Sequence, residues 1–153
     1  MAKEKQSSFE FDFVFDENSS QSQIYEYTTR NLINNVLEGY NATVLAYGAT
    51  GTGKTYTMVG NGVNNGIMIR TIKDLFYYVN SNIMDNKQFI IKISFIEIYN
   101  ETIKDLLSND NSIVELKTDS KKGLVLKNAL IKKISNYIKR QFEICTAIRH
   151  GSR

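Results

Sequence analysis

The sequence predicts an α/β fold in which helices flank a central sheet and a small β-hairpin is added. Short β-rich runs alternate along the chain with stretches whose apolar residues recur at helical spacing. The most apolar segment, residues 89–99, reads FIIKISFIEIY and is typical of a strand buried on both faces. A glycine-rich loop over residues 48–53 follows one β-rich run and precedes helix-forming residues. The chain has 153 residues, about the size of one domain or part of one.

The elements expected in the first part of the chain follow from these periodicities. Alternating phenylalanines over residues 9–15 predict a half-buried strand. Apolar residues at helical spacing predict one helix over residues 20–37, with Gly39 at its C-terminal end. Residues 42–47 predict a short strand, and a short helix is expected over residues 55–60.

The second part of the chain is expected to continue this alternation. A loop of glycine and asparagine is predicted over residues 61–66. Three further helices are expected, over residues 69–83, over residues 101–107 and from Ser135 to Gly151. A hairpin is predicted from two short strands and the turn between them, at residues 113–116, 124–126 and 119–123 respectively.

Composition excludes several classes of protein. Hydrophobic residues make up 42% of the chain and charged residues 23%, which argues against wholesale disorder. One cysteine, Cys145, and one histidine, His150, are too few for an internal disulfide or a Cys/His zinc centre. No apolar run reaches the ~18 residues of a membrane helix, and no signal-peptide pattern opens the chain. A net charge of +3 is mild, so no nucleic-acid partner is expected, and without a membrane-length apolar run no membrane partner is expected either.

A phosphate-binding loop is the strongest functional signal in the sequence. The pattern G-x-x-x-x-G-K-S/T is matched in full by Gly48, Ala49, Thr50, Gly51, Thr52, Gly53, Lys54 and Thr55. The glycines allow positive φ and bring backbone N–H groups around phosphate oxygens, and a helix beginning near Lys54 adds its positive dipole end. Lys54 can reach the β- and γ-phosphates, and the Thr55 hydroxyl can ligate Mg²⁺. The predicted fold is therefore of the P-loop NTPase type.

Hydrolysis of a nucleotide needs more than this loop. Residues 89–97 form the one Walker-B-like segment of the sequence, an apolar run that ends in Glu97 where Asp is usual. Glu97 is either a carboxylate on the metal side or the polar end of a core strand. The sequence holds no D-x-x-G pattern and no N-K-x-D-type segment, so a small P-loop kinase or GTPase is disfavoured.

Motifs spread over nearly the whole chain resemble those of the kinesin motor domain. They occur in family order and with family-like gaps, at residues 11–16, 23–26, 39–58, 94–101 and 105–107. Their sequences are FDFVFD, QIYE, GYNATVLAYGATGTGKTYTM, SFIEIYNE and DLL. The run TVLAYGATGTGKTYTM looks most like the kinesin-eight subfamily, whose members walk toward microtubule plus ends and shorten them.

The resemblance implies cofactors, a partner and the residues that meet them. The cofactors are ATP and Mg²⁺, the partner is the microtubule (tubulin), and the location is the cytoplasm and its microtubule cytoskeleton, in spindle or axoneme. Lys54 and Thr55 take the catalytic role at the phosphates. Tyr56 stands near the adenine ring, and Tyr25 is a weaker candidate for that role. The tubulin contact falls on three lysines of the predicted hairpin region, Lys121, Lys122 and Lys127.

Plainer interpretations stand beside two of these roles. A tyrosine that follows the loop can be an ordinary residue of a helix surface or core. Lysines in a lysine-rich chain commonly form a solvated face. The hairpin context favours the functional interpretation, because the family uses this hairpin against tubulin, which is acidic.

The chain departs from the family pattern at both ends. The family's first strands, with an R-x-R-P motif, would precede residue 9, and its two switches, N-x-x-S-S-R-S-H and D-x-x-G, would follow residue 153. We therefore interpret residues 1–8 as a polar N-terminal segment and residues 9–153 as a partial, incomplete motor domain that ends before the first switch. The expected function is the ATP-binding portion of a microtubule-dependent ATPase that moves along microtubules or depolymerises them, with this chain inactive by itself. The alternative is a non-catalytic remnant that binds nucleotide or tubulin without turnover.

Overall fold

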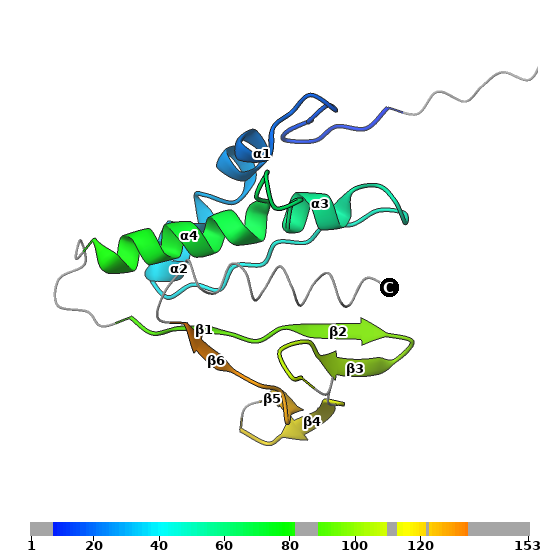
Figure 1. Ribbon diagram of the computed structural model, residues 1–153, viewed down its shortest axis with the longest axis vertical. Coiled ribbons are helices and arrows are strands. Elements are labelled where there is room, and N and C mark those ends of the chain that lie inside the picture. Colours follow the sequence, from blue (N-terminus) through cyan, green and yellow to red (C-terminus); the bar gives the residue numbers. More distant parts are fainter. Residues whose placement is uncertain (1–7, 82–88, 110–112, 122, 135–153) are drawn as a thin grey trace, which may run out of the picture. The chain divides into compact units, whose positions relative to one another are not determined.

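The computed structural model describes residues 8–81, 89–109, 113–121 and 123–134 (Figure 1). The chain divides into two compact units, Met1–Thr71 and Ile72–Arg153, and the division falls within the longest helix. The described helices are α1 (Gln21–Thr28), α2 (Leu32–Leu37), α3 (Lys54–Met58) and α4 (Ile67–Asn80). The described strands are β1 (Ile91–Ile93), β2 (Ile96–Tyr99), β3 (Thr102–Asp105), β4 (Glu115–Asp119), β5 (Gly123–Lys127) and β6 (Lys132–Ile134).

Helix α1 begins at a capping box. The Ser20 side chain accepts from the Gln23 backbone N–H, and the Gln23 side chain accepts from the Ser20 N–H at 2.8 Å. The helix ends when the N–H groups of Thr29 and Arg30 both donate to the Tyr25 carbonyl at 3.0 Å. The prediction of one helix over residues 20–37 is therefore wrong in detail, because these two hydrogen bonds end α1 and a second helix, α2, starts after three intervening residues.

Helix α2 ends as the sequence predicts, at Gly39. This residue has φ +103°, a conformation that glycine adopts without steric cost. The Tyr40 N–H donates to the Asn35 carbonyl at 2.9 Å and the Gly39 N–H to the Val36 carbonyl at 3.1 Å. These two bonds satisfy carbonyls that have no partner inside the helix.

The predicted loop over residues 61–66 is confirmed, and it folds back on the end of α3. The Gly66 N–H donates to the Val59 carbonyl at 2.9 Å. A Cβ added at Gly66 would lie 2.6 Å from backbone atoms of Thr57, Met58 and Val59. The loop can approach α3 this closely only because residue 66 has no side chain.

Two predicted strands of the first unit are not observed. Residues 9–15 and 42–47 have no regular secondary structure. A strand is defined by a hydrogen-bonded neighbour, and among the described residues neither segment has one. The phenylalanines pack as rings instead, with the Phe13 centroid 5.4 Å from that of Tyr27.

The described residues of the second unit form three antiparallel strand pairs, β1–β6, β2–β3 and β4–β5. The predicted single strand over residues 89–99 is two strands, because β1 pairs with β6 whereas β2 pairs with β3. The predicted helix over residues 101–107 is wrong, since β3 occupies most of it. Asn100 and Glu101 both have positive φ, 46° and 61°, which makes a two-residue hairpin turn between β2 and β3.

The predicted hairpin near residue 120 is confirmed and longer than expected. Strands β4 and β5 pair from Glu115 opposite Lys127 to Asp119 opposite Gly123 (Figure 1). The helix expected over residues 69–83 is α4, and it ends at Asn80. The last expected helix, from Ser135, lies outside the described residues, as do Cys145 and His150.

A buried carboxylate holds the second unit together. Asp105 is fully buried, and its two carboxylate oxygens accept from the N–H groups of Leu107 at 2.8 Å and Leu130 at 2.6 Å. The Lys132 ammonium donates to the Leu107 carbonyl at 2.9 Å. Asp105 therefore ties the end of β3 to the segment between β5 and β6.

Within the described ranges, no helix has both the length and the apolar character needed to cross a membrane.

We expect Gly66→Ala to lower the free energy of unfolding by about 1–3 kcal/mol, because the added methyl group would press on backbone that cannot move aside cheaply. Gly39→Asn is the control and should cost less than about 1 kcal/mol, because space is open there and Asn tolerates positive φ. Urea unfolding followed by far-UV circular dichroism measures both. Unchanged stability of Gly66→Ala would contradict the packing of this loop on α3.

Candidate nucleotide-binding site

The phosphate loop runs directly into α3, and its glycines have the backbone angles that the motif requires. Gly51 has φ +84°, and Gly53, at the N-cap of α3, has φ +90°. No atom lies within 4 Å of the position that a Cβ would take at either residue. Both glycines are therefore required for their backbone conformation, and the space beside them is open to a ligand. At Gly48 a Cβ would lie 2.8 Å from the Thr52 hydroxyl.

Lys54 folds back over its own loop. Its side-chain ammonium donates to the Gly48 carbonyl at 2.9 Å and to the Ala49 carbonyl at 2.6 Å. The Thr52 hydroxyl donates to the same Ala49 carbonyl at 2.8 Å. These bonds hold the positive charge of Lys54, which is half-buried, against the loop that the motif assigns to phosphate. An ammonium group has three donors, and this arrangement uses two of them on carbonyls.

The residues after Lys54 face solvent. Thr55 is exposed, and 46% of the Tyr56 side chain is exposed, so both are accessible to a ligand. Tyr25 is 4% exposed and belongs to the core of the first unit. Burial makes Tyr25 unsuitable as a stacking surface for a base, whereas the exposure of Tyr56 suits one.

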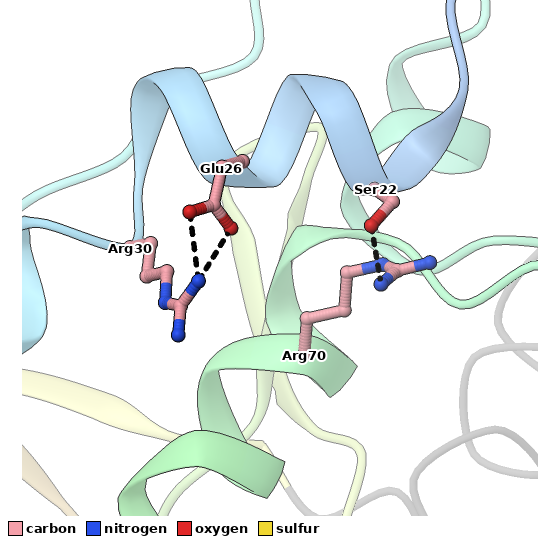
Figure 2. Close-up of polar contacts among 4 residues, drawn as sticks. All are labelled: Ser22, Glu26, Arg30 and Arg70. Atoms are coloured by element: carbon pink, nitrogen blue, oxygen red, sulfur yellow. Dashed lines mark hydrogen bonds and ion pairs between the residues drawn. The ribbon is translucent and has the colours of Figure 1, made fainter.

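Two residues that the sequence analysis did not single out join α1 to the segment behind the loop. The Gln21 side-chain amide donates to the Tyr56 carbonyl in α3. Arg70 donates through Nε to the Asn65 carbonyl at 2.8 Å and through Nη1 to the Ser22 hydroxyl at 3.4 Å (Figure 2). Polar residues at the start of a helix, such as Gln21 and Ser22, are usually interpreted as helix caps. No local sequence signal therefore indicates that they contact residues 35 and 48 positions away.

A separate ion pair joins α1 to the residues just after it and takes no part in these contacts. One Arg30 nitrogen, Nη1, contacts both carboxylate oxygens of Glu26, at 2.7 and 2.8 Å (Figure 2). Both side chains are about half exposed, at 50% and 52%. A pair this exposed contributes little to stability, about 0–1 kcal/mol.

Glu97, the Walker-B-like candidate, lies in β2 directly opposite Lys104 of β3. This register suits the plainer interpretation of Glu97 as a residue of a strand pair. Among the described residues no group of three or more His, Cys, Asp or Glu side chains is placed to hold a metal ion.

The hairpin lysines lie in a mixed charge environment. Lys121 and Lys127 are exposed, and Lys122 is outside the described residues. Glu115 pairs with Lys117 at 3.0 Å and stands opposite Lys127 in the strand register. The hydrogen bond and charge of Lys117, together with the charge of Lys127, hold the pKa of Glu115 below its ordinary value. The Glu115 contact in turn raises the pKa of Lys117. The Glu115–Lys117 contact thus stabilises the hairpin at pH values above the ordinary pKa of a glutamate. This stabilisation is lost as the pH falls through the lowered pKa of Glu115.

Comparison with known proteins identifies the family. The model of the kinesin motor domain matches residues 1–152 of this chain. The chain therefore belongs to the kinesin motor domain family.

Named relatives agree with this family and with the kinesin-eight likeness. The kinesin-like protein KIF18A of Mus musculus is 44% identical over 122 residues, which is 80% of this chain and 14% of the relative. The kinesin-like protein KIN-8A of Arabidopsis thaliana is 45% identical over 117 residues, 76% of this chain and 16% of the relative. The kinesin-like protein 5 of Schizosaccharomyces pombe is 50% identical over 99 residues, 65% of this chain and 11% of the relative. The chain thus spans only a small part of each of these relatives.

Solved structures confirm the fold class. A fast kinesin, described for its ATPase mechanism and its interactions with microtubules, is 32% identical with a TM-score of 0.87, covering 96% of this chain and 42% of that one. A KIF14 dimer with AMP-PNP in complex with a microtubule is 28% identical with a TM-score of 0.80, covering 88% of this chain and 38% of that one. The chain is accordingly part of the α/β motor fold.

Proposed function

We propose that this chain is the ATP-binding portion of a microtubule motor, and that residues 48–56 hold the nucleotide. The observation that carries the proposal is the geometry of Lys54 in its loop, within a chain of the kinesin family. The residues suit Mg·ATP: the space beside Gly51 and Gly53 is open, and Thr55 and Tyr56 are exposed. When bound, Mg·ATP supplies the transferable phosphoryl group and the charge of the metal.

Each residue of the loop has a role that its chemistry allows. The Lys54 ammonium can exchange its bonds to the Gly48 and Ala49 carbonyls for charge-assisted bonds to phosphate oxygens, which are stronger. The Thr55 hydroxyl would hold the Mg²⁺, and the Tyr56 ring would lie beside the adenine. The positive φ of Gly51 and Gly53 would let the loop direct backbone N–H groups toward the phosphates.

The proposed partner is the microtubule, reached through the β4–β5 hairpin. The microtubule complex of KIF14 supports this partner, and the exposure of Lys121 and Lys127 supports this surface. Glu115 and Asp119 on the same hairpin reduce its net positive charge, so the lysines would contribute modestly. The site of action would be the microtubule cytoskeleton, and the kinesin-eight likeness extends the proposal to microtubule shortening.

Lys54→Ala should weaken Mg·ATP binding at least tenfold, because it removes the mobile cation that follows the β- and γ-phosphates; this equals about 1.4 kcal/mol or more. Lys73→Ala is the matched control, since Lys73 is an exposed lysine of α4, and it should bind like the original chain. Isothermal titration calorimetry on the folded chain measures both. Equal affinity of Lys54→Ala and the original chain would overturn the assignment of the phosphate loop.

The 153-residue chain alone should hydrolyse ATP no faster than background, with or without microtubules. Phosphoryl transfer depends on positioned charges and a positioned water, and the sequence holds neither switch motif that supplies them in the family. Phosphate release from the purified chain and from Lys54→Ala measures this. Robust turnover that requires Lys54 would contradict the prediction.

The coding sequence beyond residue 153 distinguishes a motor from the alternative, a remnant without turnover. A motor requires both switch motifs in frame. A remnant would lack one or both of them.

Replacing Lys121, Lys122 and Lys127 together by Ala should weaken microtubule affinity about tenfold at low salt in a motor domain that contains this chain. Exposed charge pairs contribute about 0–1 kcal/mol each, and the deficit should shrink as salt screens them. A second triple replacement, of the exposed Lys73, Lys92 and Lys133, changes the net charge equally and should have a smaller effect. Co-sedimentation with microtubules at three ionic strengths measures both. Equal pelleting of the two triple variants would mean that the hairpin lysines are only a solvated face.

A further inference from the structure

The helix that carries Lys54 cannot satisfy its own C-terminal end. Helix α3 has five residues, and the last four carbonyls of any α-helix lack partners within it. Helices this short are also unstable in isolation. The position of Lys54 therefore depends on groups outside α3 that bond to its last turn.

Two groups of the first unit bond at this end of α3, one to the C-cap residue and one inside the helix. The Gly66 N–H donates at 2.9 Å to the carbonyl of Val59, the C-cap residue immediately after the helix. The Gln21 side-chain amide reaches across from α1 and donates to the Tyr56 carbonyl. Gln21 is thus a side-chain cap on α3, supplied by a helix that lies 35 positions earlier in the sequence.

Gln21 occupies a place that is costly for a polar side chain. It is 4% exposed, and its Oε1 has no hydrogen-bond partner among the described groups. An unpaired buried acceptor is unfavourable, so an apolar side chain would suit this position unless the donor is needed. The geometry makes the amide N–H, rather than the amide oxygen, the useful part of Gln21.

The same turn of α1 makes a second connection to the segment after α3. Ser22 accepts from Arg70 (Figure 2). Arg70 Nε in turn donates to the Asn65 carbonyl, in the loop that packs on α3. The Arg70 N–H donates to the Gly66 carbonyl at 3.1 Å. The first turn of α1 therefore supports α3 directly through Gln21 and indirectly through Arg70 and the loop.

We propose that Gln21 is a positioning residue for the phosphate loop, which acts by fixing the middle of α3 and with it the placement of Lys54. Tyr56 lies only two residues after Lys54, about half a helical turn, so a shift of α3 at the Tyr56 carbonyl displaces the backbone that carries the ammonium group. The proposal rests on the proposed nucleotide site. Gln21 itself need not touch the nucleotide.

The first test compares two identical changes in the same turn of α1. Gln21→Met keeps the length of the side chain and removes the donor, and it should weaken Mg·ATP binding by the folded chain about tenfold. Gln23→Met is the matched control: it removes the α1 cap formed with Ser20 but no bond to α3, so nucleotide affinity should change less than twofold. Calorimetry gives the affinities, and thermal unfolding gives the folded fraction for correction.

In a second variant, the hydrogen-bond donor at position 21 is present only when the side chain is protonated at low pH. Gln21→Glu has the shape of Gln, and its protonated form has an O–H that can donate to the Tyr56 carbonyl. Burial disfavours the charged form, so the pKa of this glutamate should lie above its ordinary value. Relative to the original chain at the same pH, Gln21→Glu should bind Mg·ATP nearly normally at about pH 5.5 and several-fold more weakly at about pH 9.

The outcomes distinguish this inference from the proposed function. Loss of binding in Lys54→Ala together with normal binding in Gln21→Met overturns the positioning role and leaves the nucleotide site standing. Normal binding in Lys54→Ala overturns both. A Gln21→Glu deficit that is the same at both pH values shows that Gln21 contributes only packing, and it also overturns the positioning role.

Discussion

The phosphate loop depends on a helix that cannot hold its own ends. Helix α3 is one turn long, and it fixes Lys54 only because neighbouring segments bond to its last carbonyls. Gln21 bonds from α1 to the Tyr56 carbonyl inside α3, and Gly66 bonds from the following loop to the carbonyl of the C-cap residue Val59. The absence of side chains at Gly60 and Gly66 lets the loop close against α3, since a Cβ at either position would collide with backbone. The phosphate loop, the loop after α3 and the first turn of α1 are therefore structurally coupled.

The second unit is organised around a different constraint, a carboxylate that is fully buried. Asp105 stays in the interior because both of its oxygens accept backbone N–H groups, from Leu107 and Leu130. Such bonds to a charged acceptor offset the cost of removing it from water. The consequence is functional as well as structural, because the residues tied by Asp105 lie on both sides of the β4–β5 hairpin in the sequence. The surface proposed for tubulin thus has a fixed base.

The charges on that hairpin argue for a weak and adjustable contact. Lys121 and Lys127 are exposed, but Glu115 stands opposite Lys127 and bonds to Lys117. Acids among the lysines reduce the attraction to an acidic partner and leave it sensitive to salt. Under the proposed function, such a surface suits a motor that must release its track in each cycle, because no single pair holds it strongly.

The sequence by itself determined the features that depend on neighbouring residues. The phosphate loop, Gly39 at the end of α2, α4 and the β4–β5 hairpin were all predictable, since backbone angles and helical or strand periodicity are local properties. The family was predictable too, because its motifs are short and keep their order. The strands at residues 9–15 and 42–47 and the helix at residues 101–107 were predicted wrongly, because a strand exists only with a partner. The turn at Asn100 and Glu101 lacked the usual glycine signal.

Only the tertiary structure decided which distant residues support the site. Nothing near Gln21 in the sequence indicates that its amide caps α3, and nothing near Arg70 indicates that it bonds to Ser22. The burial of Asp105 likewise follows from β5 and β6 returning to the end of β3. Local propensity fixes backbone angles, whereas a buried hydrogen bond between segments forms only when folding brings its donor and acceptor together. For that reason the sequence determined the loop that would hold a phosphate, and the fold determined what holds that loop in place.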